Sequence, residues 1–174
     1  MKKILIVVDR IPLDYGGAEK QIYNLLSSNF RDYNIEYSIA TRLQNINNNF
    51  YSDFLKKNIK IFDLYKNGGS RFNRAILLKN IIKKEKIDFI QSYLSGDNIL
   101  CAVAKFGTNT KHISGARSDY GNKNFKRSFS RKFLDYFSWL LSDKIISNNN
   151  SGVKYLSKLC FIKKEKIVVI NNGI

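Results

Sequence analysis

Two adjacent glycines, Gly16 and Gly17, stand between an apolar run and a helical pattern near the start of the chain. Residues 4–8 are apolar and predict a strand that is buried on both faces. Apolar side chains then repeat at the helical period, at Ala18, Ile22, Leu25 and Leu26. Glycines at such a turn let backbone N–H groups at a helix start approach a phosphate. The pair is a candidate phosphate site, although neither GxGxxG nor the P-loop pattern occurs and a plain turn is the alternative.

An arginine, Arg117, follows another predicted strand and can hold a phosphate or carboxylate with two hydrogen bonds. Ser118 and Lys123 follow it and could bind the same group. The alternative is an ion pair between Arg117 and Asp119 that only orders the loop. Both interpretations stay open from the residues alone.

Hydroxyl and amide side chains follow the strand predicted at residues 88–92. Tyr93, Ser95 and Asn98 suit hydrogen bonds to sugar hydroxyls, but Ser and Asn are also ordinary helix caps. The only histidine, His112, lies inside a predicted strand, where a structural role is expected. No Asp-x-Asp pair and no cluster of acidic, Cys or His residues indicates a metal site, so no metal is expected.

The segment 123–139 combines basic and aromatic residues. Phenylalanines recur every four residues at 125, 129, 133 and 137, which predicts a helix that packs them in the core. The alternative is an interfacial helix whose Phe and Trp enter a bilayer while cations meet anionic head groups. Those cations are Lys123, Lys126, Arg127, Arg131 and Lys132. No signature of a nucleic-acid-binding module is present, and no nucleic acid is expected as a partner.

Strand and helix patterns must position all of these residues, and they alternate along the chain. Strands are predicted at residues 4–8, 36–41, 59–64, 88–92, 111–114, 144–147 and 166–170. Helices are predicted at 18–26, 50–57, 72–82, 99–106, within 123–141, and at 151–160 with Ser151 as N-cap. The alternation predicts a doubly wound, mostly parallel, Rossmann-like α/β sheet with helices on both faces, in one domain of residues 1–174. Ligands bind such sheets beyond the carboxyl ends of the strands, where the polar turns should meet.

Composition bounds the class of protein. The chain of 174 residues is 44% hydrophobic, enough for one domain with its own core, and carries a formal charge of +16. The charge favours an acidic partner, unless it only reflects a bias toward Lys, Asn and Ile over the whole chain. Cys101 and Cys160 fit no metal spacing and suit a reducing compartment. No export signal or membrane span is expected, so the cytoplasm is the predicted location, with peripheral contact to the inner face of the membrane as an addition.

Four segments resemble the amino-terminal half of the family 4 glycosyltransferases, which have the GT-B architecture. They are GGAEKQIYNL, DFIQSYLSGDNIL, ISGARSD and VINNGI, in the expected order. The resemblance implies that Gly16 and Gly17 lie near the diphosphate of a nucleotide-sugar, which is the donor, and that no other cofactor is needed. It also implies retention at the anomeric carbon, and the missing Asp-x-Asp pair predicts that the transfer is metal-independent. Many members have a histidine that contacts the donor sugar at about the place where Tyr93 stands.

The resemblance further implies an acceptor-side domain and a lipid-linked or polysaccharide acceptor. The donor-binding carboxyl-terminal domain of the family falls outside residues 1–174, so the chain is expected to be inactive alone. It would be a truncated product or one part of a split enzyme that a separate chain completes. The alternative function is a non-catalytic basic α/β module that docks on an anionic membrane or on a partner chain.

Overall fold

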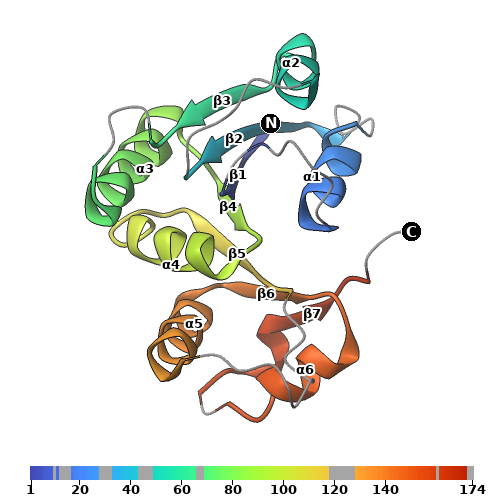
Figure 1. Cartoon of the computed structure of the whole chain (residues 1–174), viewed down its shortest axis with the longest axis vertical. Coiled ribbons are helices and arrows are strands. Elements are labelled where there is room, and N and C mark those ends of the chain that lie inside the picture. Colours follow the sequence, from blue (N-terminus) through green and yellow to red (C-terminus); the bar gives the residue numbers. More distant parts are fainter. Residues whose placement is uncertain are drawn as a thin grey trace.

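The computed structural model of the chain describes residues 1–9, 11, 17–27, 33–42, 49–65, 69–117, 128–159 and 161–171. Strands and helices alternate through these residues (Figure 1). In chain order the elements are β1 (Lys2–Val8), α1 (Gly17–Ser27), β2 (Ile35–Thr41), α2 (Asn49–Lys56), β3 (Lys60–Asp63), α3 (Arg71–Glu85), β4 (Phe89–Ser92), α4 (Ser95–Ala104), β5 (Lys111–Ala116), α5 (Phe129–Leu141), β6 (Lys144–Ser147), α6 (Asn150–Leu156), the short 3-10 helix η2 (Lys164–Lys166) and β7 (Ile167–Val169).

The seven strands form one sheet in the order β3-β2-β1-β4-β5-β6-β7, and each neighbouring pair is parallel. This confirms the predicted doubly wound α/β fold. The chain moves outward from β1 through β2 to β3, then returns to β4 and moves outward on the other side. The carboxyl ends of β1 and β4 therefore flank the point where the winding reverses, which is the usual place for a ligand.

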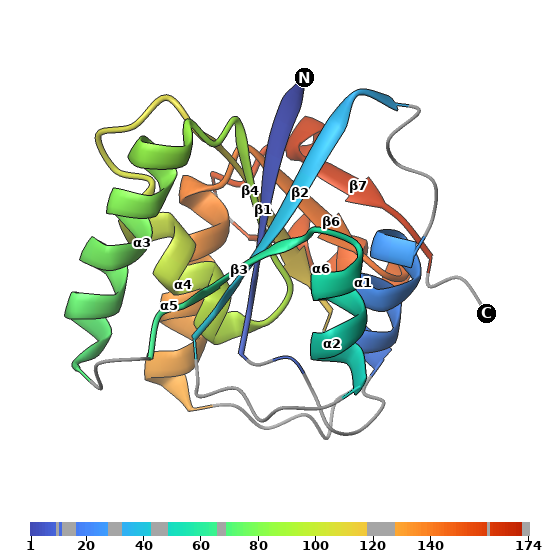
Figure 2. The ribbon, with the colours of Figure 1, turned by 90° about the horizontal axis from the view of Figure 1, so that it is seen from above.

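Helices cover both faces of the sheet. Helices α3, α4 and α5 lie on one face, and α1 and α2 lie on the other (Figures 1 and 2). Helix α6 packs beside α5, where the ring centroids of Trp139 and Tyr155 are 6.5 Å apart. Because side chains alternate along a strand, Leu5 and Val7 of β1 pack under α3 and α4, whereas Ile6 packs under α1 and α2. A further cluster surrounds the buried Trp139 between α5, β6 and α6. None of the described helices is both long and apolar enough to cross a bilayer.

Helix starts differ from the sequence prediction in two places. Helix α4 begins at Ser95, four residues before the apolar pattern predicted it. The N-cap of α6 is Asn149, and the prediction of Ser151 was wrong. Asn149 has extended backbone and its Oδ1 accepts from the N–H of Gly152 at 2.7 Å, while Ser151 already lies inside the helix.

Helix α5 exposes the phenylalanines that were predicted to pack in the core. The exposed fractions are 85% for Phe129, 55% for Phe133 and 48% for Phe137. The buried residues of α5 are Asp135, Ser138 and Trp139, which follow the i, i+3, i+4 spacing of the opposite side. Core packing was therefore the wrong interpretation for these three rings. Phe125 lies outside the described residues.

Candidate functional site

A cluster of three charged residues joins segments that follow different strands at the carboxyl edge of the sheet. Asp9 follows β1, Arg42 follows β2, and Asp97 lies in the first turn of α4 after β4. The Nη2 of Arg42 donates to Asp9, and its Nε donates to Oδ1 of Asp97 at 3.1 Å. Arg42 therefore fixes the ends of β1 and β2 against the start of α4. Sequence reasoning missed this cluster because Arg42 and Asp97 are 55 positions apart and each is an ordinary loop or cap residue.

The cluster has unusual protonation equilibria. Asp97 is fully buried, and this burial, followed by the nearby carboxylate of Asp9, raises the pKa of Asp97 well above its usual value despite the charge of Arg42. Burial acts to lower the pKa of Arg42, but the charges of Asp97 and Asp9 together raise it. The guanidinium therefore stays charged, while Asp97 takes up a proton more readily than an exposed aspartate does. Hydrogen bonds from one arginine to two carboxylates can fix the loops beside a site. Both carboxylates are then occupied by Arg42 and are not free to contact a ligand.

Arg117, the predicted anion-binding residue, stacks on the buried ring of Tyr93. Its guanidinium carbon lies 4.3 Å from the ring centroid, a cation–π contact. Gln91 Nε2 donates to the Tyr93 hydroxyl at 3.1 Å, and burial raises the pKa of Tyr93 to about 12, so the phenol is neutral. Burial lowers the pKa of Arg117. Within the described part of the chain its buried Nε has no hydrogen-bond partner. Asp119, the proposed ion-pair partner, lies outside the described residues.

Asn98 belongs to a buried hydrogen-bond network. Its exposed fraction is 1%, its Oδ1 accepts from Ser92 at 2.6 Å, and its Nδ2 donates to the carbonyl of Gly115 at 2.8 Å. Ser92 Oγ also lies 2.8 Å from Nε2 of His112, and burial lowers the pKa of that histidine to about 3. These bonds favour a structural role for Asn98, which connects β4, α4 and β5. The role in binding sugar hydroxyls stays a prediction.

The other predicted site residues fall into two groups. Ser95 is half-buried and donates to Asp135 of α5, and Gly17 is exposed at the start of α1. Both follow the carboxyl ends of strands, as Tyr93, Asn98 and Arg117 do. Arg131 and Lys132 are exposed near the start of α5. The remaining predicted residues lie outside the described part of the chain: Gly16, Ser118, Lys123, Lys126 and Arg127.

A cavity of about 480 Å³ opens at the same edge, between the first turns of α3, α4 and α5. Arg42, Ser95 and Gly96 line it, so it borders the charge cluster. The backbone at Gly96 passes close to the arginine, because a Cβ there would lie 2.7 Å from Nη2 of Arg42. A side chain at this position would push the guanidinium away from its carboxylates.

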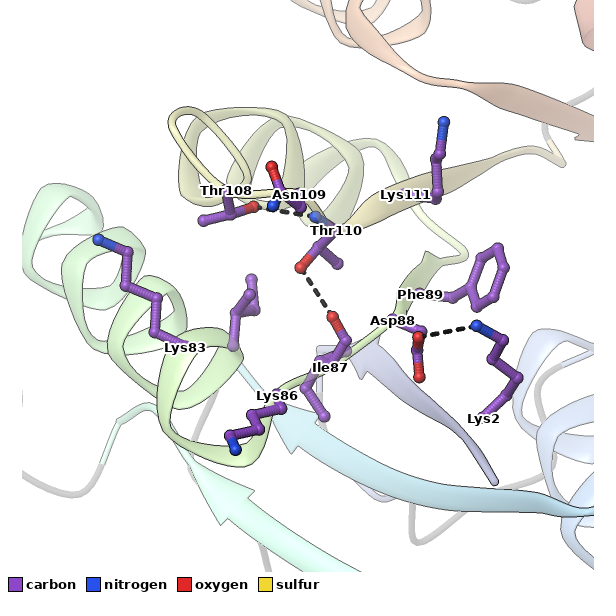
Figure 3. A pocket seen from close by; sticks show the side chains of 11 residues that line it. Lys2, Lys83, Lys86, Ile87, Asp88, Phe89, Thr108, Asn109, Thr110 and Lys111 are labelled. Carbon is purple, nitrogen blue, oxygen red and sulfur yellow. Dashed lines mark hydrogen bonds and ion pairs between the residues drawn. The ribbon is translucent and has the colours of Figure 1, made fainter.

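A second hollow, of about 530 Å³, lies at the opposite edge, by the amino ends of β4 and β5 (Figure 3). Lysines 2, 83, 86 and 111 line it. Lys2 pairs with Asp88 at 3.1 Å, and Thr110 Oγ1 donates to the carbonyl of Ile87 at 2.8 Å (Figure 3). Its position is not where parallel α/β sheets usually bind their ligands. Among the described residues, no group of three or more His, Cys, Asp or Glu side chains is placed to hold a metal ion.

The seven-stranded parallel sheet and its charged carboxyl edge define a Rossmann-like α/β domain, and the sequence says to which family it belongs. The profile of Glycosyltransferase Family 4 matches residues 15–174. The chain therefore belongs to that family, as the resemblance implied. No curated protein sequence matches the chain.

Solved structures share this fold at low identity. A glycosyltransferase from Rickettsia africae is 22% identical with a TM-score of 0.69, over 99% of this chain and 43% of its own. Anabaena HepE in complex with UDP and glucose is 16% identical with a TM-score of 0.72, over 100% of this chain and 45% of its own. The UDP-GlcNAc 2-epimerase of Methanocaldococcus jannaschii is 16% identical with a TM-score of 0.65, over 99% of this chain and 46% of its own. The chain thus spans less than half the length of each, and the likeness confirms a Rossmann-like half of the GT-B architecture.

Proposed function

We propose that the chain supplies the acceptor side of a glycosyltransferase that moves a sugar from a nucleotide-sugar to a lipid-linked or polysaccharide acceptor. The match of residues 15–174 to Glycosyltransferase Family 4 carries this proposal, because the fold is shared with an epimerase and does not choose the reaction. The complex of HepE with UDP and glucose supports a nucleotide-sugar as the donor. Retention at the anomeric carbon and metal-independent transfer are part of the proposal, and no cofactor besides the donor is invoked.

The proposal includes a second, donor-binding domain, in the same polypeptide or in a separate chain, without which transfer does not occur. Its support is the share of the similar structures that this chain covers, 43% to 46%. The cleft between the two domains would lie along the carboxyl edge. Tyr93, Ser95, Arg117, Ser118 and Lys123 would face the acceptor there.

Gly17 is the residue proposed to meet the donor diphosphate, together with Gly16. It opens the 11-residue helix α1, and apart from its chain neighbours and the backbone of α1 no described atom lies within 4 Å of the place where a Cβ would stand. N–H groups at a helix start carry partial positive charge. Here they would stabilise the charge that develops on the leaving diphosphate.

Transfer assays on the chain supplied with a family 4 donor-binding domain test the assignment. Gly17→Trp should lower kcat/KM by about 100-fold or more, because the indole blocks the approach of the diphosphate to the N–H groups. Ser27→Trp adds the same bulk at the other end of α1, about 15 Å away, and should leave transfer unchanged. Full activity in a Gly17→Trp, Arg117→Ala double variant would contradict the assignment. Equal loss in Ser27→Trp would point to damage of the fold.

A second candidate function is docking on an anionic membrane, and the exposed rings of Phe129, Phe133 and Phe137 favour it. Flotation with vesicles that contain an anionic phospholipid tests it. Binding should be lost in a variant with serine at these three positions. It should also weaken when the charges of Lys126, Arg127, Arg131 and Lys132 are removed, but persist in Arg117→Ala. Flotation that survives both sets of changes would exclude this surface.

A further inference from the structure

Among the described residues, the cavity between the first turns of α3, α4 and α5 is lined by four arginines, Arg42, Arg71, Arg74 and Arg131, and by no acidic side chain. Figure 2 shows that α3 and α5 start on the same side of the molecule, which brings residues from distant parts of the chain together. Arg42 is already paired with Asp9 and Asp97. The charge available to a ligand therefore comes from the other three guanidinium groups.

These three arginines have no acidic partner within the described part of the chain. Arg71 and Arg131 are exposed and appear in none of the ion pairs formed there. Arg74 donates from Nη2 to the carbonyl of Gly69 at 3.1 Å and lies 5.1 Å from the ring centroid of Tyr65. Its Nε is buried and makes no hydrogen bond to a described residue. Arg74 nevertheless lines the cavity without an acidic partner, so its guanidinium charge can attract an anion there.

The remaining lining combines three serines, Ser95, Ser128 and Ser130, with a larger apolar wall. Phe72 of α3, Val103 of α4 and Leu134 of α5 form this wall, with exposed fractions of 68%, 51% and 42%. Ile99 and Leu100 continue the surface along α4. An inorganic anion would leave this wall in water. A ligand with a charged head and an apolar chain would cover both parts of the lining.

Arg131 belongs to this cavity and not to the row of phenylalanines on α5. At about 100° of rotation per residue, Arg131 lies about 200° from both Phe129 and Phe133, on the other side of the helix. The basic hollow at the opposite edge differs in kind, because lysines line it and one of them is paired with Asp88. Guanidinium groups fit phosphate oxygens with two hydrogen bonds, and lysines act as point charges.

We infer that this cavity binds a phosphate ester that carries an apolar chain. The phosphate lies among Arg71, Arg74 and Arg131, and the chain follows Phe72, Val103 and Leu134. The cavity also borders Ser95 and Arg42 at the carboxyl edge. Resting on the proposed function, the ligand is the lipid-phosphate part of the acceptor, held beside the place of transfer.

Calorimetric titration of the whole chain with octyl phosphate, below its critical micelle concentration, tests the inference. Two comparison ligands separate the parts: inorganic phosphate has no chain, and octyl glucoside has the same chain on an uncharged head. Octyl phosphate should bind at least tenfold more tightly than either. Equal binding of inorganic phosphate, or equal binding of octyl glucoside, would overturn the inference, since only one half of the lining would then contribute.

Variants locate the binding. Arg71→Gln with Arg131→Gln should weaken octyl phosphate binding at least tenfold, whereas Lys132→Gln, next on α5 but outside the lining, should not. Val103→Asp should weaken it as much, and Phe133→Asp should not. Binding that ignores the cavity variants would place the ligand elsewhere and overturn the inference.

Vesicles of phosphatidic acid separate a membrane lipid from a soluble phosphate ester. If the chain floats with these vesicles but does not bind octyl phosphate, the arginines act in docking on a membrane surface, and this result contradicts the inference. The titration with octyl phosphate involves no donor sugar, so its result does not depend on whether the chain takes part in sugar transfer. Octyl phosphate binding without transfer in the completed enzyme would contradict the proposed function alone. Transfer without such binding would contradict the inference alone.

Discussion

Burial sets the charge of His112 at the residue scale, with a consequence for stability. The side chain is fully buried, and its pKa falls from 6.5 to about 3. Between these values the unfolded chain binds a proton that the folded chain does not, so stability falls as the pH drops below 6.5. Each pH unit should cost about 1.4 kcal/mol from this residue.

Urea denaturation of the wild type and of His112→Gln at several pH values measures this effect. The variant loses packing at every pH, but its unfolded state gains no proton at position 112. The wild type's advantage in unfolding free energy should therefore shrink by up to about 1.4 kcal/mol per pH unit from pH 6 to pH 5. Asp97, whose raised pKa acts in the opposite direction, is present in both proteins and cancels. A constant advantage over this range would show that His112 is not neutral in the fold.

Gly115 of β5 has no room for a side chain beside the end of β4. A Cβ there would lie 2.9 Å from the carbonyl oxygen of Tyr93 and 3.0 Å from that of Ser92. Both atoms belong to the backbone, so Gly115→Ala must move a strand and should cost about 1–3 kcal/mol of unfolding free energy. Gly17→Ala is the matched control and should cost less than about 0.5 kcal/mol, because apart from its chain neighbours and the backbone of α1 its Cβ meets no described atom within 4 Å. Thermal or urea unfolding checks both, and equal effects would refute the steric account.

At the scale of elements, the start of α6 offers a test of capping. Asn149 Oδ1 accepts from the N–H of Gly152, whereas Ser151 lies one residue into the helix. Asn149→Ala should lower the unfolding free energy by about 1 kcal/mol. Ser151→Ala should change it by less than about 0.5 kcal/mol, as expected of an exposed position without a cap. Urea denaturation of the two variants shows which residue caps α6. A larger loss of unfolding free energy in Ser151→Ala than in Asn149→Ala would identify Ser151 as the N-cap, as the sequence predicted.

Strands were easier to predict than helix starts for a physical reason. Residues 144–147 were predicted as a strand and form β6 (Lys144–Ser147), because a short apolar run between turns has few other uses in a parallel sheet. Helix α4 starts earlier than its apolar pattern, since Asp97 and Asn98 are buried through polar partners and not through apolar contacts. Hydrophobic periodicity does not register such residues. The same holds on α5, where buried Asp135 and Ser138 face the core and the phenylalanines do not.

The sequence predicted that the site lies at the carboxyl edge of the sheet, but not which side chains contact one another there. Parallel topology places Gly17, Asn98 and Arg117 beyond the carboxyl ends of their strands, and the sequence pattern was sufficient for that. It did not show that the amide of Asn98 forms hydrogen bonds with Ser92 and Gly115, or that Arg117 stacks on the ring of Tyr93. Hydrogen bonds between residues far apart in sequence depend on the packing of whole layers. The arginine-lined cavity could not be predicted for the same reason.

For the whole molecule, the dominant electrostatic feature is an excess of 16 positive charges, from 30 basic and 14 acidic residues. Like charges at this density repel one another and favour the unfolded state, in which they are further apart. Local attractions oppose this, as in the pairs Lys2–Asp88 and Lys60–Glu85. Exposed pairs of this kind contribute only about 0–1 kcal/mol each. Repulsion should therefore outweigh them.

Salt should consequently stabilise the chain. Raising NaCl from 0.01 M to 0.1 M shortens the screening length from about 30 Å to about 10 Å, which weakens repulsion across the molecule more than attraction within close pairs. A gain of about 1 kcal/mol would raise Tm by about 2–4 °C in a chain of this size. Thermal unfolding at the two salt concentrations measures it, with potassium chloride as a control that should act equally. A fall in Tm would mean that the ion pairs dominate. Sodium phosphate at matched ionic strength should add little further, because the cavity between α3, α4 and α5 needs an apolar chain on its anion to bind tightly.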